Sequence, residues 1–408
     1  MPDVIVVGAG PVGTLLSAEL SRLGVSVALL DQRGAPGDGT RAIGVHSPVL
    51  AALEASGVTE RLLASAVRVR RGQARSDGRT LGVVRFDRLD RRFPFVAALP
   101  QAATETALGV GAPPVQRGAV ATAVVPQRGA VRVRLSDGEQ AAPLVVVAGG
   151  WRARPLVYRP GAVHVRPYAD RYLMTDAAAS VDSGSDARSG FGSDAGVGSD
   201  VGSGSDAGSG SGSDAGVGSD VAIVNVDRSG VLESFPLPGG RRRFVAWDEA
   251  PGDASGPARV ARLRRALEIR GEDPALVVDA TPFEVRRAVA PALRRDRLFV
   301  IGDTAHEVSP IGGQGMNLGL LDAATLAPLL AAWVRSGSAP EADLARWERR
   351  RLASARTAAA LATLNTSLGR PLGRVPHAVR RAALRLALLP PGAALLAHAY
   401  AMGFDRDA

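Results

Sequence analysis

The chain contains neither cysteine nor lysine among its 408 residues. Without cysteine there are no disulfide bonds, no thiolate metal sites and no cysteine nucleophile. Such a composition is typical of the reducing cytoplasm, which is the location we expect. Because lysine is absent, the net charge of +9 is carried by arginine. Aromatic residues make up only 4% and are not interleaved with basic clusters, so we expect no nucleic-acid partner.

The sequence also offers few candidates for a metal site or a membrane span. The five histidines have no metal-ligand spacing, so we expect no metal. The longest uncharged stretch near the C-terminus, Leu386–Phe404, is interrupted by Pro390 and Pro391. Because proline breaks a helix, this stretch predicts two short packed helices. Met1–Asp3 lead directly into the first strand, and we expect no signal peptide.

The N-terminal stretch VIVVGAGPVG predicts a nucleotide-binding turn. A buried strand over Val4–Val7 precedes Gly8, Gly10 and Gly13, and an amphipathic helix follows. In a G-x-G-x-x-G turn the glycines permit a tight turn, the approach of a pyrophosphate and close packing of helix on strand. The helix N-terminus offers free N–H groups to the phosphates. Asp31 ends the next strand, where its carboxylate can accept hydrogen bonds from an adenosine ribose. This pattern alone suits NAD and FAD equally.

A second glycine-rich turn lies far along the chain, in RLFVIGDTAHEVSPIGGQGMNLGLLDAATLAPLL (Arg297–Leu330). Asp303 follows an apolar strand, and the glycines lead into a long helix. A carboxylate at this place can accept hydrogen bonds from ribityl hydroxyls. A helix N-terminus stabilises a flavin ring that becomes anionic on reduction. The two turns together therefore favour FAD.

The segment Ser183–Asp220 differs in composition from the rest of the chain. GSDAGVGSD occurs twice in it, at Gly192–Asp200 and Gly212–Asp220. A calcium-binding β-roll is disfavoured because the spacing is irregular and no apolar position recurs. We expect a disordered insertion between two strands.

Four segments of the chain resemble a known enzyme family. They are VVGAGPVGTLLSAELSRLGVSVALLDQR, TRAIGVHSPVLAALEASGV, LPQAATETAL and VIGDTAHEVSPIGGQGMNLGLLDAATLAPLL. The chain looks like the FAD-dependent aromatic hydroxylases, the class A flavoprotein monooxygenases of the p-hydroxybenzoate and ubiquinone-biosynthesis hydroxylase type. The likeness covers almost the whole length apart from Ser183–Asp220.

The resemblance implies an α/β fold in which a Rossmann-like FAD-binding domain is interleaved with a β-sheet substrate domain and followed by C-terminal helices. The FAD-binding parts would be 1–66, 101–157 and 286–335. The substrate domain would comprise 67–100 and 158–285, with the insertion 183–220, and the helices 336–408.

The resemblance also implies a set of FAD contacts. The first turn would hold the pyrophosphate, with Arg33 beside Asp31. Arg41 and Gln101 would contact the phosphate and ribityl region, Asp303 the ribityl hydroxyls, and the second turn the isoalloxazine ring. The complete predicted set is Gly8, Gly10, Pro11, Val12, Gly13, Asp31, Arg33, Arg41, Gln101, Asp303, Pro310, Gly312, Gly313, Gln314, Gly315, Met316 and Asn317.

One departure from the family concerns an Asp-Gly motif implicated in both FAD and NADPH binding. In VVVAGGWRARP, Gly149 stands at the aspartate position and Ala153 at the serine position, whereas Gly150 and Arg152 remain.

The family resemblance implies hydroxylation or epoxidation of an aromatic or polycyclic small molecule by O2, through a flavin hydroperoxide, with NAD(P)H as reductant. The altered motif keeps two alternatives open: a flavin dehydrogenase or reductase, and a non-catalytic flavin-binding protein. A flavin halogenase is disfavoured because that group relies on a lysine.

No side chain is identified as a catalytic acid or base. We expect His306 to be structural. Phe235, Phe244 and Trp247 either line a substrate pocket or pack in the core of the second sheet.

The helix in GRVPHAVRRAALRLALLP (Gly373–Pro390) either makes weak peripheral contact with an anionic membrane or packs on the protein with a solvated basic face. The oligomeric state is not predicted.

Overall fold

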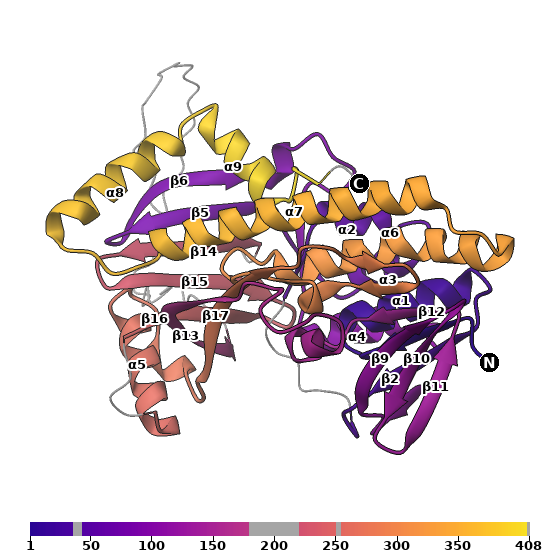
Figure 1. Ribbon diagram of the computed structural model, residues 1–408. Helices are drawn as coiled ribbons and strands as arrows, with labels where there is room; N and C mark the ends of the chain where they lie inside the picture. Colours follow the sequence, from indigo (N-terminus) through magenta and orange to yellow (C-terminus); the bar gives the residue numbers. More distant parts are fainter. Residues whose placement is uncertain (36–42, 179–219, 250–253, 406–408) are drawn as a thin grey trace, which may run out of the picture.

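The computed structural model describes residues 1–35, 43–178, 220–249 and 254–405 (Figure 1). Arg41 and most of the glycine-serine-aspartate repeat, up to residue 219, therefore lie outside the described residues.

A six-stranded sheet carries the N-terminal turn. Its order is β18 (Arg294–Arg295), β19 (Leu298–Val300), β12 (Leu144–Val147), β1 (Val4–Val7), β2 (Val27–Asp31) and β8 (Val115–Arg117). All neighbours are parallel except β18 and β19. The central strands β1 and β12 are buried along their whole length, as expected for parallel strands covered on both faces.

Side chains of β1 alternate between two layers. Val4 and Val6 face a core shared with the helices α1 (Pro11–Arg22), α4 (Gln101–Gly109) and α6 (Gly315–Ser336). Ile5 and Val7 face a small antiparallel sheet of β9 (Ala121–Gln127), β10 (Ala130–Leu135) and β11 (Gly138–Ala142). This layering buries both faces of the nucleotide-binding sheet.

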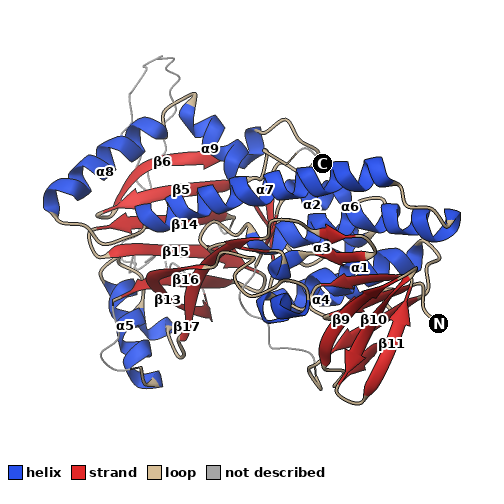
Figure 2. Ribbon diagram, in the orientation of Figure 1, coloured by secondary structure: helices blue, strands red, loops and turns tan. Residues whose placement is uncertain are grey.

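The second large sheet has eight strands, which Figure 2 shows in succession from β6 to β17. The spatial order of the strands, from one edge of the sheet to the other, is β20 (His306–Glu307), β17 (Thr281–Val289), β13 (Arg166–Ala178), β16 (Arg241–Asp248), β15 (Gly230–Leu237), β14 (Val221–Asp227), β5 (Arg71–Ser76) and β6 (Arg79–Arg85). A three-stranded sheet of β3 (Gly44–Val45), β7 (Val96–Ala98) and β4 (Val67–Val69) lies against β15. Two short helices, α2 (Ser47–Ala52) and α3 (Val58–Leu63), follow β3.

Helices cover both faces of the eight-stranded sheet. The helix α5 (Gly256–Glu268) packs against β13 and β16 through Leu263 and Leu267. On the other face lie α7 (Glu341–Leu368), α8 (Arg374–Ala387) and α9 (Gly392–Tyr400), with α8 and α9 beside β6 (Figure 1). The predicted fold class, an interleaved FAD-binding domain and β-sheet domain with C-terminal helices, is confirmed.

The apolar helices of the C-terminal half are core and surface elements. The helix α6 is apolar and long enough to cross a membrane, but 67% of its most apolar window is buried inside the protein. The stretch Leu386–Phe404 is broken as predicted, since α8 and α9 are bent by 91° around Pro390 and Pro391.

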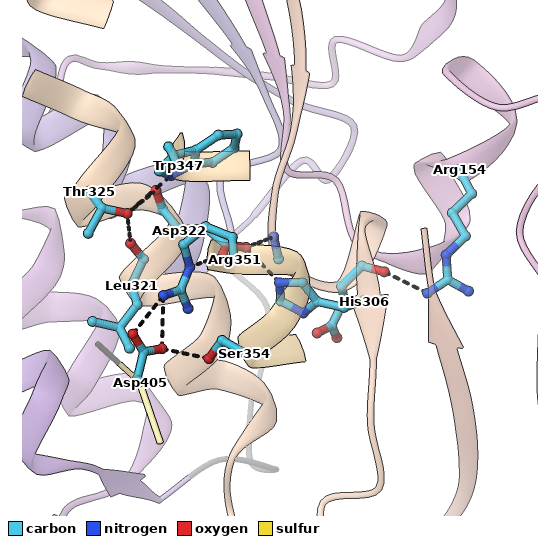
Figure 3. Close-up of polar contacts among 11 residues, drawn as sticks. Arg154, His306, Leu321, Asp322, Thr325, Trp347, Arg351, Ser354 and Asp405 are labelled. Carbon is cyan, nitrogen blue, oxygen red and sulfur yellow. Dashed lines mark hydrogen bonds and ion pairs between the residues drawn. The ribbon is translucent and has the colours of Figure 1, made fainter. Parts of the chain in front are cut away.

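A buried ionic network joins α6, α7 and the C-terminal segment (Figure 3). Asp322 of α6 contacts His306 Nε2 at 2.6 Å and accepts a hydrogen bond from Arg351 Nε of α7 at 2.9 Å. Arg351 also pairs with Asp405 at 2.8 Å, and Ser354 donates to Asp405. Burial alone would raise the pKa of Asp322, but His306 and Arg351 prevail and lower this pKa to about 2. As expected, His306 belongs to a structural network.

Breaking this network should destabilise the protein strongly. We expect Arg351→Met to reduce the free energy of unfolding by about 3–5 kcal/mol, because two buried carboxylates lose the arginine that they share. Since the folded pKa of Asp322 is depressed, its contribution is present above the ordinary pKa of 3.8 and is lost as the pH falls through about 2. Urea denaturation measures both effects.

The matched control for this prediction is Arg346→Met, also on α7. Arg346 pairs with Asp343 at an exposed position, where an ion pair contributes about 0–1 kcal/mol. Equal losses in the two variants would contradict a special role for the buried network.

Candidate functional site

The first glycine-rich turn can be formed only by glycine at two positions. Gly8 has φ +111°, and a Cβ atom there would lie 2.6 Å from the carbonyl oxygen of Ala148. A Cβ on Gly13 would lie 1.9 Å from the carbonyl oxygen of Gly8. In contrast, a Cβ on Gly10 would meet no atom within 4 Å. The turn is therefore closed on its sheet side and open in front of the α1 N-terminus, which has no side-chain cap.

Asp31 contacts the same turn. Its Oδ2 accepts the Ala9 N–H at 2.8 Å, and Oδ1 accepts the Arg33 N–H at 2.8 Å. The Arg33 side chain covers the carboxylate, with NH2 2.9 Å from Oδ2. Burial works against ionisation, but the Arg33 and Ala9 hydrogen bonds lower the pKa of Asp31. The carboxylate is thus charged and paired with Arg33.

Val12 connects the two predicted turns. It lies in the first turn of α1, and its side chain would be 3.2 Å from a Cβ on Gly302 and 2.5 Å from a Cβ on Gly319. Gly302 precedes Asp303, and Gly319 is on α6. Because both partners are glycine, α1 can pack closely on the second motif. Segments far apart in the sequence therefore meet at this contact.

The second turn has the geometry of an open helix N-terminus. Gly312 and Gly313 have φ +98° and +69°, a region that favours glycine. The helix α6 begins without a side-chain cap. Asn317 accepts the His46 N–H on Oδ1 and donates to the carbonyl oxygens of Gly44 and Gly313. This amide fixes the turn against β3, so its contribution to a cofactor site is positional.

The remaining predicted contacts are distributed around the two turns. Gln101 donates to Glu105 at the start of α4. Pro310 and Asp303 are exposed, whereas Gln314 is 3% exposed and Met316 is half-buried. Asp31 contacts the first turn at Ala9, and Val12 joins that turn to the second, whereas for Gln101 the structure shows a contact with Glu105.

Arg154 was not predicted from the sequence, yet it joins the altered motif to the second turn (Figure 3). Its guanidinium donates to the carbonyl oxygens of Asp303 and Thr304 at 2.9 and 3.2 Å and pairs with Glu307 at 2.9 Å. A Cβ on Gly149 would lie 2.8 Å from the Cβ of Ala153. The sequence carries this arginine directly after Ala153, the last position of the altered motif.

Buried polar groups without partners gather on the other side of the second turn. Among the residues that the structure describes, Gln314 Oε1 and His46 Nδ1 are buried and make no hydrogen bond. Burial lowers the pKa of His46 to about 4. Phe235 lies on the sheet face toward β3–β7–β4, and Trp247 on the same face near Tyr172. Phe244, in contrast, packs toward α5 in the core, so it is not a pocket residue.

Comparison with known proteins places these features in one family. The model of the FAD binding domain family matches residues 1–139 and 220–362. The chain belongs to this FAD-binding family.

Curated relatives of this chain are bacterial monooxygenases. The 6-methylpretetramide 4-monooxygenase of Streptomyces rimosus is 31% identical over 90% of this chain and 63% of its own length. A rifampicin monooxygenase of Rhodococcus hoagii is 30% identical over 93% of this chain and 74% of its own. The chain thus spans somewhat less than two thirds of the first of these relatives.

Solved structures show the same fold. The p-nitrophenol 4-monooxygenase PnpA of Pseudomonas putida has a TM-score of 0.81 at 19% identity, covering 100% of this chain and 99% of its own. The anhydrotetracycline hydroxylase OxyS of Streptomyces rimosus has a TM-score of 0.71 at 24% identity, covering 99% and 76%.

FAD fits the residues of the two turns. The open space before Gly10 and the uncapped α1 N-terminus suit a pyrophosphate. The uncapped α6 N-terminus and the unpartnered Gln314 Oε1 suit the polar edge of a flavin. Among the described residues, no group of three His, Cys, Asp or Glu side chains forms a metal site.

Gly13→Ala should abolish stable FAD binding. The added methyl would lie 1.9 Å from Gly8 O, so the turn must open. We expect FAD affinity to fall at least tenfold, which corresponds to about 1.4 kcal/mol. Flavin absorbance after gel filtration measures this loss. Gly34→Ala, where a Cβ meets no atom within 4 Å, is the control and should keep its flavin; equal retention in both variants would contradict the turn geometry.

Proposed function

We propose that the protein is an FAD-dependent monooxygenase that hydroxylates or epoxidises an aromatic or polycyclic small molecule with O2, using NAD(P)H. The observation that carries the proposal is the meeting of two open glycine-rich turns beside a buried face of the second sheet that carries apolar side chains and a few polar groups. When bound, FAD supplies hydride acceptance and oxygen activation. The chain itself holds the cofactor, orients the substrate and excludes water.

The relatives support the substrate class. Those named above act, by their names, on 6-methylpretetramide and rifampicin. In this chain, the apolar side chains Tyr172, Met174, Val231, Val245 and Ile311 line one face of the eight-stranded sheet beside the second turn. An apolar face with a few polar groups suits a flat polycycle.

A surface beside the altered motif supports the use of a nicotinamide nucleotide. Trp151 lies between the guanidinium groups of Arg152 and Arg286, which are 4.8 and 4.6 Å from its ring centroid. The ring is 36% exposed. An aromatic ring next to two arginines suits stacking of an adenine and pairing with phosphates.

Oxygen labelling tests the proposal. Holoprotein is incubated with NADPH or NADH, 18O2 and a panel of hydroxylated anthraquinones and naphthacenes. We expect one labelled oxygen atom in the product for each NAD(P)H oxidised. The Gly13→Ala protein is the matched control.

Two other outcomes would contradict the proposal. Oxidation of NAD(P)H without label in any product would indicate a flavin reductase. A yellow protein that oxidises no NAD(P)H would indicate a non-catalytic flavin-binding protein.

The outer face of α8 supports a further proposal, peripheral contact with an anionic membrane. Val375, Val379 and Leu386 on α8, with Leu389 and Leu395 beyond it, are between 58% and 74% exposed. Arg380 is buried and donates to the carbonyl oxygens of Leu368, Arg370 and Asp227, so this arginine is not part of the exposed face of α8. Exposed arginines, Arg374 and Arg385, flank the apolar side chains and would pair with anionic lipid headgroups.

Co-sedimentation with vesicles tests this contact. We expect binding to phosphatidylglycerol vesicles, weaker binding at high salt, and a loss of about tenfold in Val379→Glu because a charge enters the apolar face. Val278→Glu makes the same change at an exposed position away from α8 and should bind normally. Absence of vesicle binding would refute the contact, and a dimer disrupted by Val379→Glu would assign the face to a second copy.

A further inference from the structure

Glu233 is a buried carboxylate without a partner. It lies on β15, is 5% exposed, and makes neither a hydrogen bond nor an ion pair within the described part of the chain. Burying a carboxylate in this way is costly for folding, because the charge loses its hydration without compensation. Fold stability therefore does not explain the residue.

The alternation of β15 determines which face Glu233 occupies. Leu232 points toward α5, so Val231 and Glu233 lie on the opposite face. Directly opposite Glu233 on the neighbouring strands are Val224 and Val245. This is the face that packs against Ile311, next to the second glycine-rich turn.

The surroundings of Glu233 connect it to that turn. Tyr400 of α9 is 3.9 Å from the position of a Cβ on Gly312, and its hydroxyl donates to Asn365. Burial raises the pKa of Tyr400 to about 12, and the charge of Glu233 contributes to this shift. Burial also raises the pKa of Tyr172, again with a contribution from Glu233. The charge of Glu233 therefore acts on both Tyr172 of β13 and Tyr400 of α9.

A cation on this face, Arg243, is engaged by another carboxylate. Arg243 lies on the same face of β16, two residues from Val245, but binds Asp176 through two hydrogen bonds of 2.6 and 2.7 Å. Burial raises the pKa of Glu233 to about 8, with no counter-charge to offset it. Such a carboxylate exchanges its proton near neutral pH.

We propose that Glu233, in its ionised form, is the residue that binds the substrate, by accepting a hydrogen bond and then the proton from a phenolic or enolic hydroxyl. The O–H bond of the substrate breaks, its electron pair stays on oxygen, and Glu233 becomes a carboxylic acid. The resulting phenolate is richer in electrons at its ring carbons, which an electrophilic oxygen donor attacks more readily. Because the step acts on substrate at the flavin, this inference rests on the proposed function.

A matched ligand pair tests the proposal. The probes are 2-hydroxyanthraquinone and 2-methoxyanthraquinone, which differ in a single hydroxyl donor. Binding is measured by the change in flavin absorbance of the holoprotein. We expect wild-type protein to prefer the phenol by at least about tenfold, and Glu233→Gln to lose most of this preference while keeping its FAD, because a neutral amide does not accept the proton.

Glu284→Gln is the matched control, since it makes the same change at an exposed carboxylate on β17. It should keep the preference for the phenol. An equal preference in wild-type protein and Glu233→Gln, or no preference in wild-type holoprotein, overturns the role of Glu233. Failure of all three proteins to hold FAD is a different result, which refutes the proposed function.

A stability measurement confirms that Glu233→Gln is folded and tests the unpaired carboxylate. Because the folded pKa is raised above the ordinary value of 4.5, wild-type stability falls as the pH rises from about 4.5 to about 8. We expect Glu233→Gln to melt at a higher temperature than wild type, with a gap that widens over this pH range. A gap independent of pH would show that Glu233 is not an unpaired buried carboxylate and would overturn the proposal.

Discussion

The close approach of α1 and α6 is the constraint on which the cofactor site depends. Val12, one residue after the start of α1, packs on Gly302 and Gly319, and any side chain at either glycine would separate the helices. This contact sets the distance between the two uncapped helix ends. One FAD molecule can therefore meet both turns, although the first precedes the second by most of the chain. The fold and the cofactor site are thus determined by the same packing.

Buried charged groups on the two sides of the second turn differ in whether they are paired. On the α6 side, the buried charges are paired: Asp322 contacts His306 and Arg351, and Asp405 continues the network. This arrangement stabilises a rigid platform. On the sheet side, Glu233 has no partner among the described residues. A protein that leaves one carboxylate unpaired beside such an ordered network loses stability there, which is typical of a functional site.

Local patterns explain why the fold and both turns could be predicted from sequence. The strand, G-x-G-x-x-G turn and helix are contiguous, and so are Asp303 and the second turn. The environments of individual side chains could not be predicted from such local patterns. The position of Arg33 over Asp31 and the burial of Arg380 depend on tertiary contacts. Glu233 was missed for the same reason, since a glutamate in an alternating strand normally faces solvent, and here both faces of β15 are covered.

The loop after β12, which carries the altered motif, is held in position although its residues differ from the family pattern. With glycine at 149, the space beside the main chain is filled by Ala153. Arg154 then holds the loop at Asp303 through main-chain carbonyl oxygens, which any residue at those positions would supply. The position of this loop therefore does not require a carboxylate at 149. Consequently, the loop keeps its position with glycine at 149, through the contacts of Ala153 and Arg154.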